Sequence, residues 1–249
     1  MSLKLERFFD EQGRRVDGRA PDELRPVEVK CGVVKRANGS AYVRQGNTKV
    51  IVAVYGPRAV IPRHQELPGR ALIRCQYQML PFSTEERKQP APTRREVEIS
   101  KVVRDALKAT VFTGNYPRTV IDIFIAVVNA DAGTRCAAIN AASVALADAG
   151  IALKDLTSSC AVGKVEGKLI LDPCGVEDYY GEADVAIAIM PQSNEITLLQ
   201  MDGRLTKEEF NKALNIVFEA CRKIYVRQRE ALRERYVRIA EAVRGEERE

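Results

Sequence analysis

The chain has 249 residues, of which 45% are hydrophobic and 29% are charged, and its formal net charge is +5. This composition excludes extended disorder and allows either one large domain or two small ones packed together. A basic excess of this size is compatible with nucleic-acid binding but does not establish it, so the positions of the arginines are more informative than their number.

The cysteines and apolar segments indicate the cellular environment. The six cysteines include no pair at the spacing of a CxxC metal knuckle, and the first 25 residues are too charged for a signal peptide. The longest apolar stretch, residues 120–128, is short and interrupted by Asp122. We therefore expect reduced thiols in a soluble, cytoplasmic protein with no membrane partner. The single histidine, His64, excludes a centre with several histidine ligands within one chain.

The first half of the chain predicts strands, a loop, a helix and a further strand. The expected strands cover residues 25–34, 40–60 (with a turn at 45–48), 71–79 and 119–129, and the expected helix covers 94–111. Asn38-Gly39 favours a tight hairpin between the first two segments. Residues 81–92 are polar and contain three prolines, which predicts a loop.

The second half predicts an alanine-rich helix, three strand segments and a long helix. These elements cover residues 134–149, 158–171, 183–190, 195–201 and 206 onward. So many small side chains in one helix indicate close packing against a sheet. Thr206 and Glu209 predict a capping box, and the charged end of the last helix is expected to fray after Val243. The order predicts an α+β or mixed α/β fold and allows two related halves in one unit, with an N-terminal arm (1–24), a core (25–205) and a C-terminal helix with a charged tail (206–249).

A first basic site stands at a predicted helix start. Thr93 and Glu96 form a capping box, which places Arg94 and Arg95 in the first helical turn. Positive charge there opposes the helix dipole by roughly 0.3–1 kcal/mol per residue. Two such arginines indicate a bound oxyanion, although a solvated surface turn has the same local pattern.

A second basic site follows the strand at 119–129. Gly133 allows a ligand close to the backbone, Thr134 adds a hydroxyl donor, and Arg135 adds a guanidinium fork for phosphate oxygens. An ordinary strand-to-helix turn with Asp131 as its cap is the alternative interpretation.

An acidic pair, Asp178 and Asp184, stands at the start of the apolar strand at 183–190, with Asp184 beginning the strand. Gly181 permits a bend that brings Asp178 back beside Asp184. Such a pair binds Mg²⁺, or one member keeps a proton because its neighbour is ionised. A solvated sheet edge is the alternative, and the neighbouring Glu177 and Glu182 leave the choice open.

Basic residues also surround the loop at 57–69, namely Arg58, Arg63, His64 and Arg70. They predict either contacts to an RNA backbone, with Arg63 and His64 as candidates, or a polar hairpin tip. No orienting partner marks His64 as a catalytic base.

Together these segments resemble the RNase PH family of phosphorolytic exoribonucleases, with the greatest similarity to the catalytic ring subunits of archaeal exosomes. Single motifs are weak, but their order is specific and spans residues 13–236. The matching segments are Arg15-Val16-Asp17-Gly18-Arg19, Leu24-Arg25-Pro26, Asn38-Gly39-Ser40-Ala41, Tyr55-Gly56-Pro57-Arg58, Pro81-Phe82-Ser83, Arg94-Arg95, Ala130-Asp131-Ala132-Gly133-Thr134-Arg135, Gly181-Glu182-Ala183-Asp184 and Leu199-Gln200-Met201-Asp202-Gly203.

The resemblance implies the RNase PH fold, which is related to the second domain of ribosomal protein S5. It also implies a hetero-hexameric ring with an inactive RNase PH-like paralogue, beneath RNA-binding cap subunits. The implied ligands are single-stranded RNA, inorganic phosphate as co-substrate and Mg²⁺. Arg94, Arg95 and Arg135 would bind RNA and inorganic phosphate, Gly133 and Thr134 would line the phosphate site, and Asp178 and Asp184 would be the catalytic and metal-binding acids.

The function expected from this resemblance is 3′→5′ phosphorolysis of RNA, releasing nucleoside diphosphates, with RNA tailing as the reverse reaction. Asp178 is the preferred acid for the departing 3′ oxygen, and Asp184 holds Mg²⁺ or shares that task. Two alternatives stay open: a free-standing RNase PH that trims tRNA 3′ ends, and a non-catalytic RNA-binding ring subunit.

Overall fold

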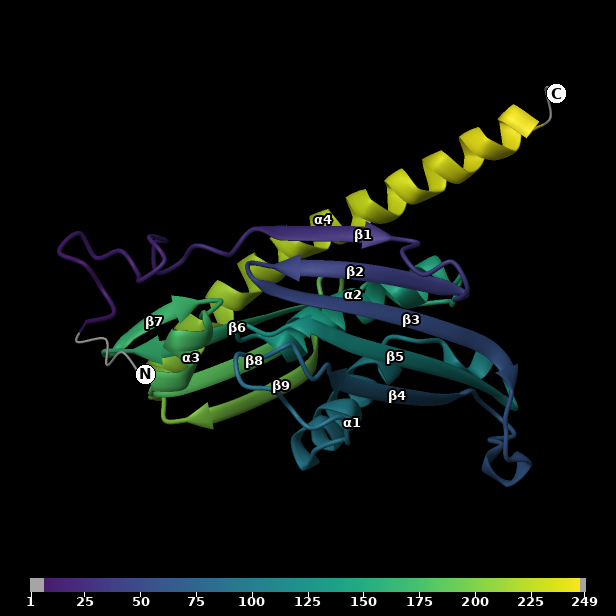
Figure 1. The fold of residues 1–249 in the computed structure, drawn as a ribbon, viewed down its shortest axis with the longest axis horizontal. Coiled ribbons are helices and arrows are strands. Elements are labelled where there is room, and N and C mark those ends of the chain that lie inside the picture. Colours follow the sequence, from purple (N-terminus) through teal and green to yellow (C-terminus); the bar gives the residue numbers. More distant parts are fainter. Residues whose placement is uncertain (1–6, 247–249) are drawn as a thin grey trace.

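The computed structural model describes residues 7–246 and contains two βα halves, as expected (Figure 1). The first half comprises β1 (Val27–Cys31), β2 (Gly39–Gln45), β3 (Thr48–Ala59), β4 (Leu72–Met79), α1 (Arg94–Lys108), β5 (Thr119–Asn129) and α2 (Thr134–Asp148). The second half comprises β6 (Ser158–Val165), β7 (Lys168–Leu171), α3 (Gly175–Tyr180), β8 (Ala183–Met190), β9 (Glu195–Gly203) and α4 (Lys207–Glu246). Two short 3₁₀ turns, η1 (Arg63–Gln65) and η2 (Thr113–Asn115), lie in loops of the first half.

Each half contributes one sheet. The first sheet has the order β1-β2-β3-β5-β4, and the second has the order β7-β6-β8-β9. Among the described strands only β4 and β5 pair in parallel, because α1 forms the crossover between them. Alternate residues of β3, such as Val50, Val52 and Val54, are fully buried, which is the period-two pattern of a strand with one face on the core.

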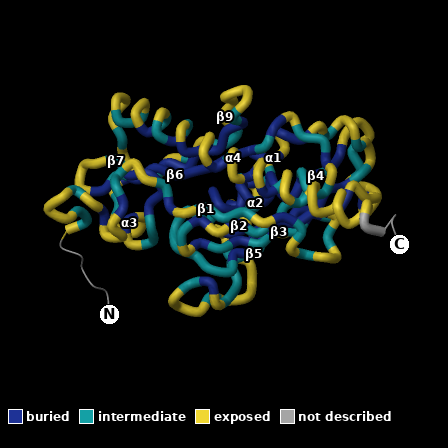
Figure 2. Tube along the Cα trace, turned by 90° about the horizontal axis from the view of Figure 1, so that it is seen from above, coloured by how far each residue is buried: buried dark blue, intermediate teal, exposed yellow. Residues whose placement is uncertain are grey.

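Helix α2 lies between the two sheets and forms the centre of the molecule (Figure 2). Every residue from Cys136 to Leu146 is buried, so the helix has no solvated face along this stretch. Its alanines allow the close packing that the sequence predicted. Gly39 of β2 shows how close: a Cβ there would lie 2.2 Å from the backbone nitrogen of Ala149 and 2.3 Å from the oxygen of Ala145.

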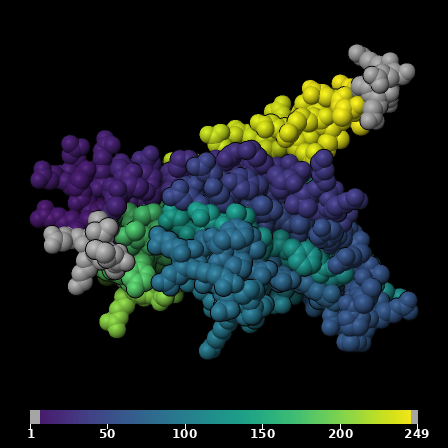
Figure 3. Space-filling view, viewed as in Figure 1, coloured from purple at the N-terminus to yellow at the C-terminus, as the bar shows by residue number. Residues whose placement is uncertain are grey.

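Helix α4 covers the second sheet through an apolar stripe that includes Val217, Cys221 and Ile224. Its start is the predicted capping box, since the amide of Glu209 donates to Thr206 Oγ1 at 3.2 Å. The helix continues to Glu246, beyond the expected fraying point at Val243. Its C-terminal part projects away from the body of the molecule (Figures 1 and 3).

The expected tight hairpin at Asn38-Gly39 is wrong. Residues 32–38 form a longer connection between β1 and β2, and Asn38 forms hydrogen bonds with β3. Its amide donates to the oxygen of Val54 at 3.0 Å, and its side-chain oxygen accepts from the amide of Gly56 at 3.0 Å. The predicted turn at 45–48 is confirmed, because Gln45 pairs directly with Thr48.

All six cysteines are free thiols, as the composition predicted. Within residues 7–246 there is no helix that combines the length and the apolar character needed to cross a membrane.

Candidate functional site

Two adjoining cavities form where α1, α2, α3 and the β8–β9 hairpin meet. The first has a volume of about 520 Å³ and the second about 580 Å³. Both are lined by Arg95, Arg135, Asp184 and Asp202, so they form one continuous site. The fold thus brings together three predicted segments, the two basic sites and the acidic pair, that stand far apart in the sequence.

The N-terminus of α2 forms one wall of the first cavity. Ala132 and Gly133 both have left-handed backbone conformations, with φ of 53° and 61°. Gly133 is the N-cap and provides no side-chain cap. Within the described part of the chain, the amides of Thr134 and Arg135 have no hydrogen-bond acceptor, so they remain available to an anion. The positive end of the helix dipole favours such an anion.

Asp131 does not cap α2, contrary to the alternative interpretation of this turn. Its carboxylate instead accepts the amide of Gly175, the first residue of α3, at 2.7 Å. The start of α2 is therefore left without a side-chain cap, which preserves its attraction for an external anion.

The start of α1 forms the wall of the second cavity. The predicted capping box is confirmed, with the amide of Thr93 donating to Glu96 Oε2 at 2.7 Å and the amide of Glu96 donating to Thr93 Oγ1 at 3.3 Å. Arg94 and Arg95 are exposed in the first turn. Across residues 7–246, the guanidinium groups of Arg94, Arg95 and Arg135 have no ion-pair partner, so they are free to bind oxyanions.

Asp178 and Asp184 both line the first cavity, but the route between them differs from the expected bend. Asp178 lies on α3, a short helix that the sequence interpretation missed. Gly181 follows this helix in an extended conformation, and a Cβ there would lie 2.8 Å from the oxygen of Glu177. The glycine therefore permits close packing rather than a left-handed turn.

The acidic pair is electrostatically coupled. Burial, followed by the charge of Asp178, raises the pKa of Asp184 from 3.8 to about 6, although Arg135 acts in the opposite direction. Its Oδ1 atom is buried and has no hydrogen-bond partner among the described residues. Desolvation also raises the pKa of Asp178, and the charges of Arg95 and Arg135 oppose that rise. Asp184 therefore holds its proton up to about pH 6, well above the usual range of the pKa of an aspartate.

Asp202 is a third acid at the site, and it had no assigned role in the sequence interpretation. It pairs directly with Asp184 across β8 and β9 and lines both cavities. Its charge contributes to the raised pKa of Asp184. The sequence did offer a way to find it, because Asp202 belongs to the family segment Leu199-Gln200-Met201-Asp202-Gly203. The predicted strands at 183–190 and 195–201 follow each other closely, and if they pair as an antiparallel hairpin, Asp202 comes to lie opposite Asp184.

The carboxylates fit a magnesium ion that is held partly by substrate. No group of three or more histidine, cysteine, aspartate or glutamate side chains within residues 7–246 forms a metal cage. Mg²⁺ in phosphate-transfer sites is held by one or two carboxylates together with substrate phosphates and waters. The unpartnered Oδ1 of Asp184 is an oxygen of the required kind.

Arg63 and His64 do not belong to this site. They lie in η1, in the loop between β3 and β4, and line neither cavity. Both side chains are exposed. Figure 1 shows this loop at the far end of the first sheet, away from α3.

Comparison with known proteins agrees with this arrangement. Domain 1 of the 3′ exoribonuclease family, RNase PH, matches residues 23–152, and domain 2 of the same family matches residues 155–220. The chain belongs to this family. The two matched regions correspond to the two βα halves, and the site lies where elements of both halves meet.

Curated relatives extend the similarity over almost the whole chain. The exosome complex component Rrp41 of Pyrococcus furiosus is 55% identical over 99% of this chain and 100% of its own length. The protein of the same name from Methanopyrus kandleri is 56% identical over 95% of this chain and 99% of its own length. Among solved structures, Rrp46 of rice matches with a TM-score of 0.79 and 26% identity, covering 88% of this chain and 100% of that chain.

Proposed function

We propose that the chain is the catalytic subunit of an archaeal exosome and degrades single-stranded RNA from its 3′ end by phosphorolysis. The observation that carries this proposal is one continuous site with three unpaired arginines, a free helix N-terminus and a carboxyl whose pKa is about 6. Two anions and one proton donor are the requirements of phosphorolysis. A hydrolase would need only one anion site.

Inorganic phosphate binds at the start of α2. The amides that follow Gly133 and the hydroxyl of Thr134 donate hydrogen bonds, and Arg135 supplies a guanidinium fork. The left-handed backbone at Gly133 supports this placement because it leaves the helix start open to the ligand. The helix dipole adds to the attraction for phosphate.

The terminal RNA phosphodiester binds beside it. Arg94 and Arg95 contact its phosphate oxygens, while Arg95 and Arg135 line both cavities and so face both anions. Two phosphates repel each other, and the arginines offset that repulsion and hold the reacting groups in line. Contacts to the backbone rather than to bases make the reaction largely independent of RNA sequence.

The reaction forms one phosphorus–oxygen bond and breaks another. A phosphate oxygen attacks the terminal phosphorus, the bond to the 3′ oxygen of the preceding nucleotide breaks, and a nucleoside diphosphate is released. The departing oxygen takes a proton from the acidic pair and becomes the new 3′ hydroxyl. Because burial favours the protonated form of Asp184, we assign it the proton, with Asp178 as the ionised neighbour that raises its pKa. This assignment differs from the sequence interpretation, which preferred Asp178.

Mg²⁺ is the proposed cofactor; the ionised carboxylate of Asp178 would hold it, together with the oxygen of Asp184 that does not carry the proton. When bound, the ion neutralises charge on the phosphates. The arginines would orient the same oxygens.

The proposed assembly is a hetero-hexameric ring with an inactive RNase PH-like paralogue and RNA-binding cap subunits, located in the cytoplasm. The exosome names of relatives that align over the full chain support this assembly. Arg63 and His64 are exposed in η1, within the loop that Figure 1 shows at the far end of the first sheet, so in this proposal they contact the RNA backbone before it reaches the acids.

Digestion of a 5′-labelled single-stranded RNA, with and without phosphate and the candidate paralogue, tests this function. We expect shortening that requires phosphate and releases nucleoside diphosphates, and excess nucleoside diphosphate should extend the RNA. Nucleoside monophosphates released without phosphate would instead establish hydrolysis. Activity of the chain alone as a homohexamer would favour a free-standing RNase PH.

The non-catalytic alternative is tested by rings that contain Asp178→Asn. Loss of turnover with RNA binding retained would exclude a purely RNA-binding role for this subunit. Unchanged shortening would place the activity in another subunit.

A further inference from the structure

Buried arginines near the N-terminus contact the segments that form the catalytic site. Arg15 is 3% exposed, and its guanidinium pairs with both carboxylate oxygens of Glu177, one of them at 2.8 Å. Glu177 precedes Asp178 on α3, and its carboxylate also accepts the amide of Cys174 at 2.8 Å. Residues of the N-terminal arm therefore hold the helix that carries an acid of the site.

Arg25 forms a second contact of this kind and reaches two segments. Its guanidinium donates to both oxygens of Asp172, at 2.9 and 2.6 Å, just before α3. It also donates to the backbone oxygen of Asp131 at 2.5 Å, just before α2. We call residues 130–134, which precede and begin α2, the phosphate turn. Arg25 thus joins the phosphate turn to the segment that leads into α3.

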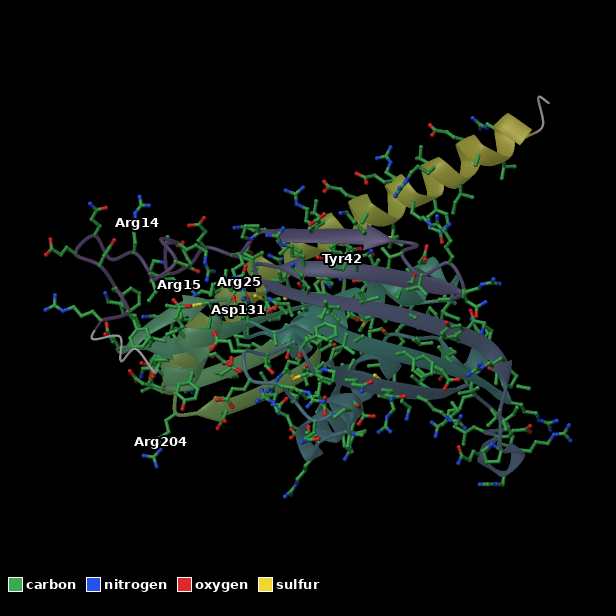
Figure 4. All side chains as sticks on the ribbon, in the orientation of Figure 1. Arg14, Arg15, Arg25, Tyr42, Asp131 and Arg204 are labelled. Atoms are coloured by element: carbon green, nitrogen blue, oxygen red, sulfur yellow. The ribbon has the colours of Figure 1, made fainter. Side chains whose placement is uncertain are left out.

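The side chain of Asp131 forms a second connection between the two segments, from the phosphate turn to α3. Its Oδ1 atom accepts the amide of Gly175 at 2.7 Å, and its Oδ2 atom accepts the side-chain amide of Asn47 at 3.1 Å. Figure 4 shows Arg15, Arg25 and Asp131 near one another at this junction. The carboxylate is therefore a direct hydrogen-bonded link between the phosphate turn and α3.

We propose that Asp131 is a positioning residue, which holds α3 and its acid at a fixed distance from the phosphate turn. This inference rests on the proposed function, because it assigns the two linked segments to the acidic pair, through Asp178, and to inorganic phosphate. A shift of about 1 Å between such groups can lower a rate on the order of 100-fold. The buried pairs of Arg15 and Arg25 stabilise both segments, so loss of the Asp131 link should alter alignment more than folding.

The exposure of the Asp131 side chain indicates that it serves in positioning α3 more than in stabilising the fold. The side chain of Asp131 is 24% exposed, whereas those of Asp172 and Glu177 are each 1% exposed. Removing a carboxylate near solvent leaves no deeply buried charge without a partner. Asp131 is therefore the member of this network that can be changed with the least damage to folding.

The test compares Asp131→Ala, Asp131→Asn and the control Asp155→Ala in the full chain, assembled with any ring partner that the parent requires. Asparagine keeps an oxygen for the amide of Gly175. Asp155 is matched because its carboxylate also accepts two amides, that of its neighbour Leu156 at 2.8 Å and that of Gln192, in another segment, at 2.9 Å, but it lines neither cavity.

We expect Asp131→Ala to lower kcat for RNA phosphorolysis at least 10-fold while KM for RNA changes less than about threefold, since the arginines of α1 are untouched. Asp131→Asn should restore most of the rate, and Asp155→Ala should lower only the melting temperature. A kcat for Asp131→Ala within twofold of the parent would overturn the proposal. Equal losses of kcat in Asp131→Ala and Asp131→Asn would show that the hydrogen bond to Gly175 is not the cause of the lower rate.

Amide hydrogen exchange across residues 172–181 tests the link without any enzymatic reaction. Asp131→Ala should speed exchange in this segment, and Asp155→Ala should not. An inactive parent ring would count against the proposed function, whereas unchanged exchange in Asp131→Ala would count against the link.

Discussion

Asp184→Asn should remove activity and at the same time stabilise the folded chain. The pKa of the Asp184 carboxyl rises from 3.8 to about 6 on folding, and each pKa unit corresponds to about 1.4 kcal/mol. The folded state therefore binds this proton more strongly than the unfolded state. Stability should fall as the pH rises from about 4 to about 6 and stay lower above that range, by up to about 3 kcal/mol.

Asparagine has nearly the shape of the protonated acid but cannot ionise, so it avoids this loss. Partial exposure and nearby counter-charges reduce the expected gain at pH 7.5 to about half the upper limit, roughly 1.5 kcal/mol. For a chain of this size that corresponds to an increase in Tm of about 3–6 °C. The gain should fall to about half at pH 5 and nearly vanish at pH 4. Loss of the proton donor should lower kcat on the order of 100-fold or more.

Thermal unfolding of both proteins in phosphate-free buffer at pH 4, 5 and 7.5 measures this effect, together with phosphorolysis assays at pH 7.5. Asp22→Asn is the control, because Asp22 is exposed and lines neither cavity. Its melting temperature should follow that of the parent at every pH. A melting temperature of Asp184→Asn at or below that of the parent at pH 7.5 would refute the reasoning, as would a gain that is independent of pH.

Three further predictions concern single contacts. Arg135→Lys should raise KM for phosphate about 10-fold in steady-state assays, because lysine lacks the bidentate fork; an unchanged KM would remove Arg135 from the phosphate site. Arg94→Ala should weaken RNA binding and reduce its dependence on salt, measured by titration at several salt concentrations, and an unchanged slope would contradict a phosphate contact. Gly39→Ala should lower the free energy of unfolding by about 1–3 kcal/mol in urea, because its Cβ would overlap the backbone of Ala149 at 2.2 Å; a smaller loss would mean that α2 can shift.

Features that depend on neighbouring residues were predictable from the sequence. The capping box of Thr93 and Glu96 places two arginines in a first helical turn through contacts three residues apart. The alanines of α2 indicated close packing, and the helix is buried from Cys136 to Leu146. The resemblance then indicated which of these local features belong to one site.

Predictions from neighbouring residues were wrong or incomplete where contacts with a distant segment determine the local structure. Asn38-Gly39 has the sequence of a tight turn, but Asn38 bonds to β3 and Gly39 packs against the C-terminal end of α2. Helix α3 was missed because it is short and because Asp131, 44 residues upstream, accepts the amide of its first residue.

The sequence by itself determined the two basic helix starts, the acidic pair and the order of the longer strands and helices, because periodicity, capping and glycine placement act over a few residues. Only the tertiary structure decided that Asp202 lies opposite Asp184 and that Arg15 contacts Glu177, 162 residues away. It also decided the raised pKa of Asp184, because burial and neighbouring charge arise only when the two halves pack together.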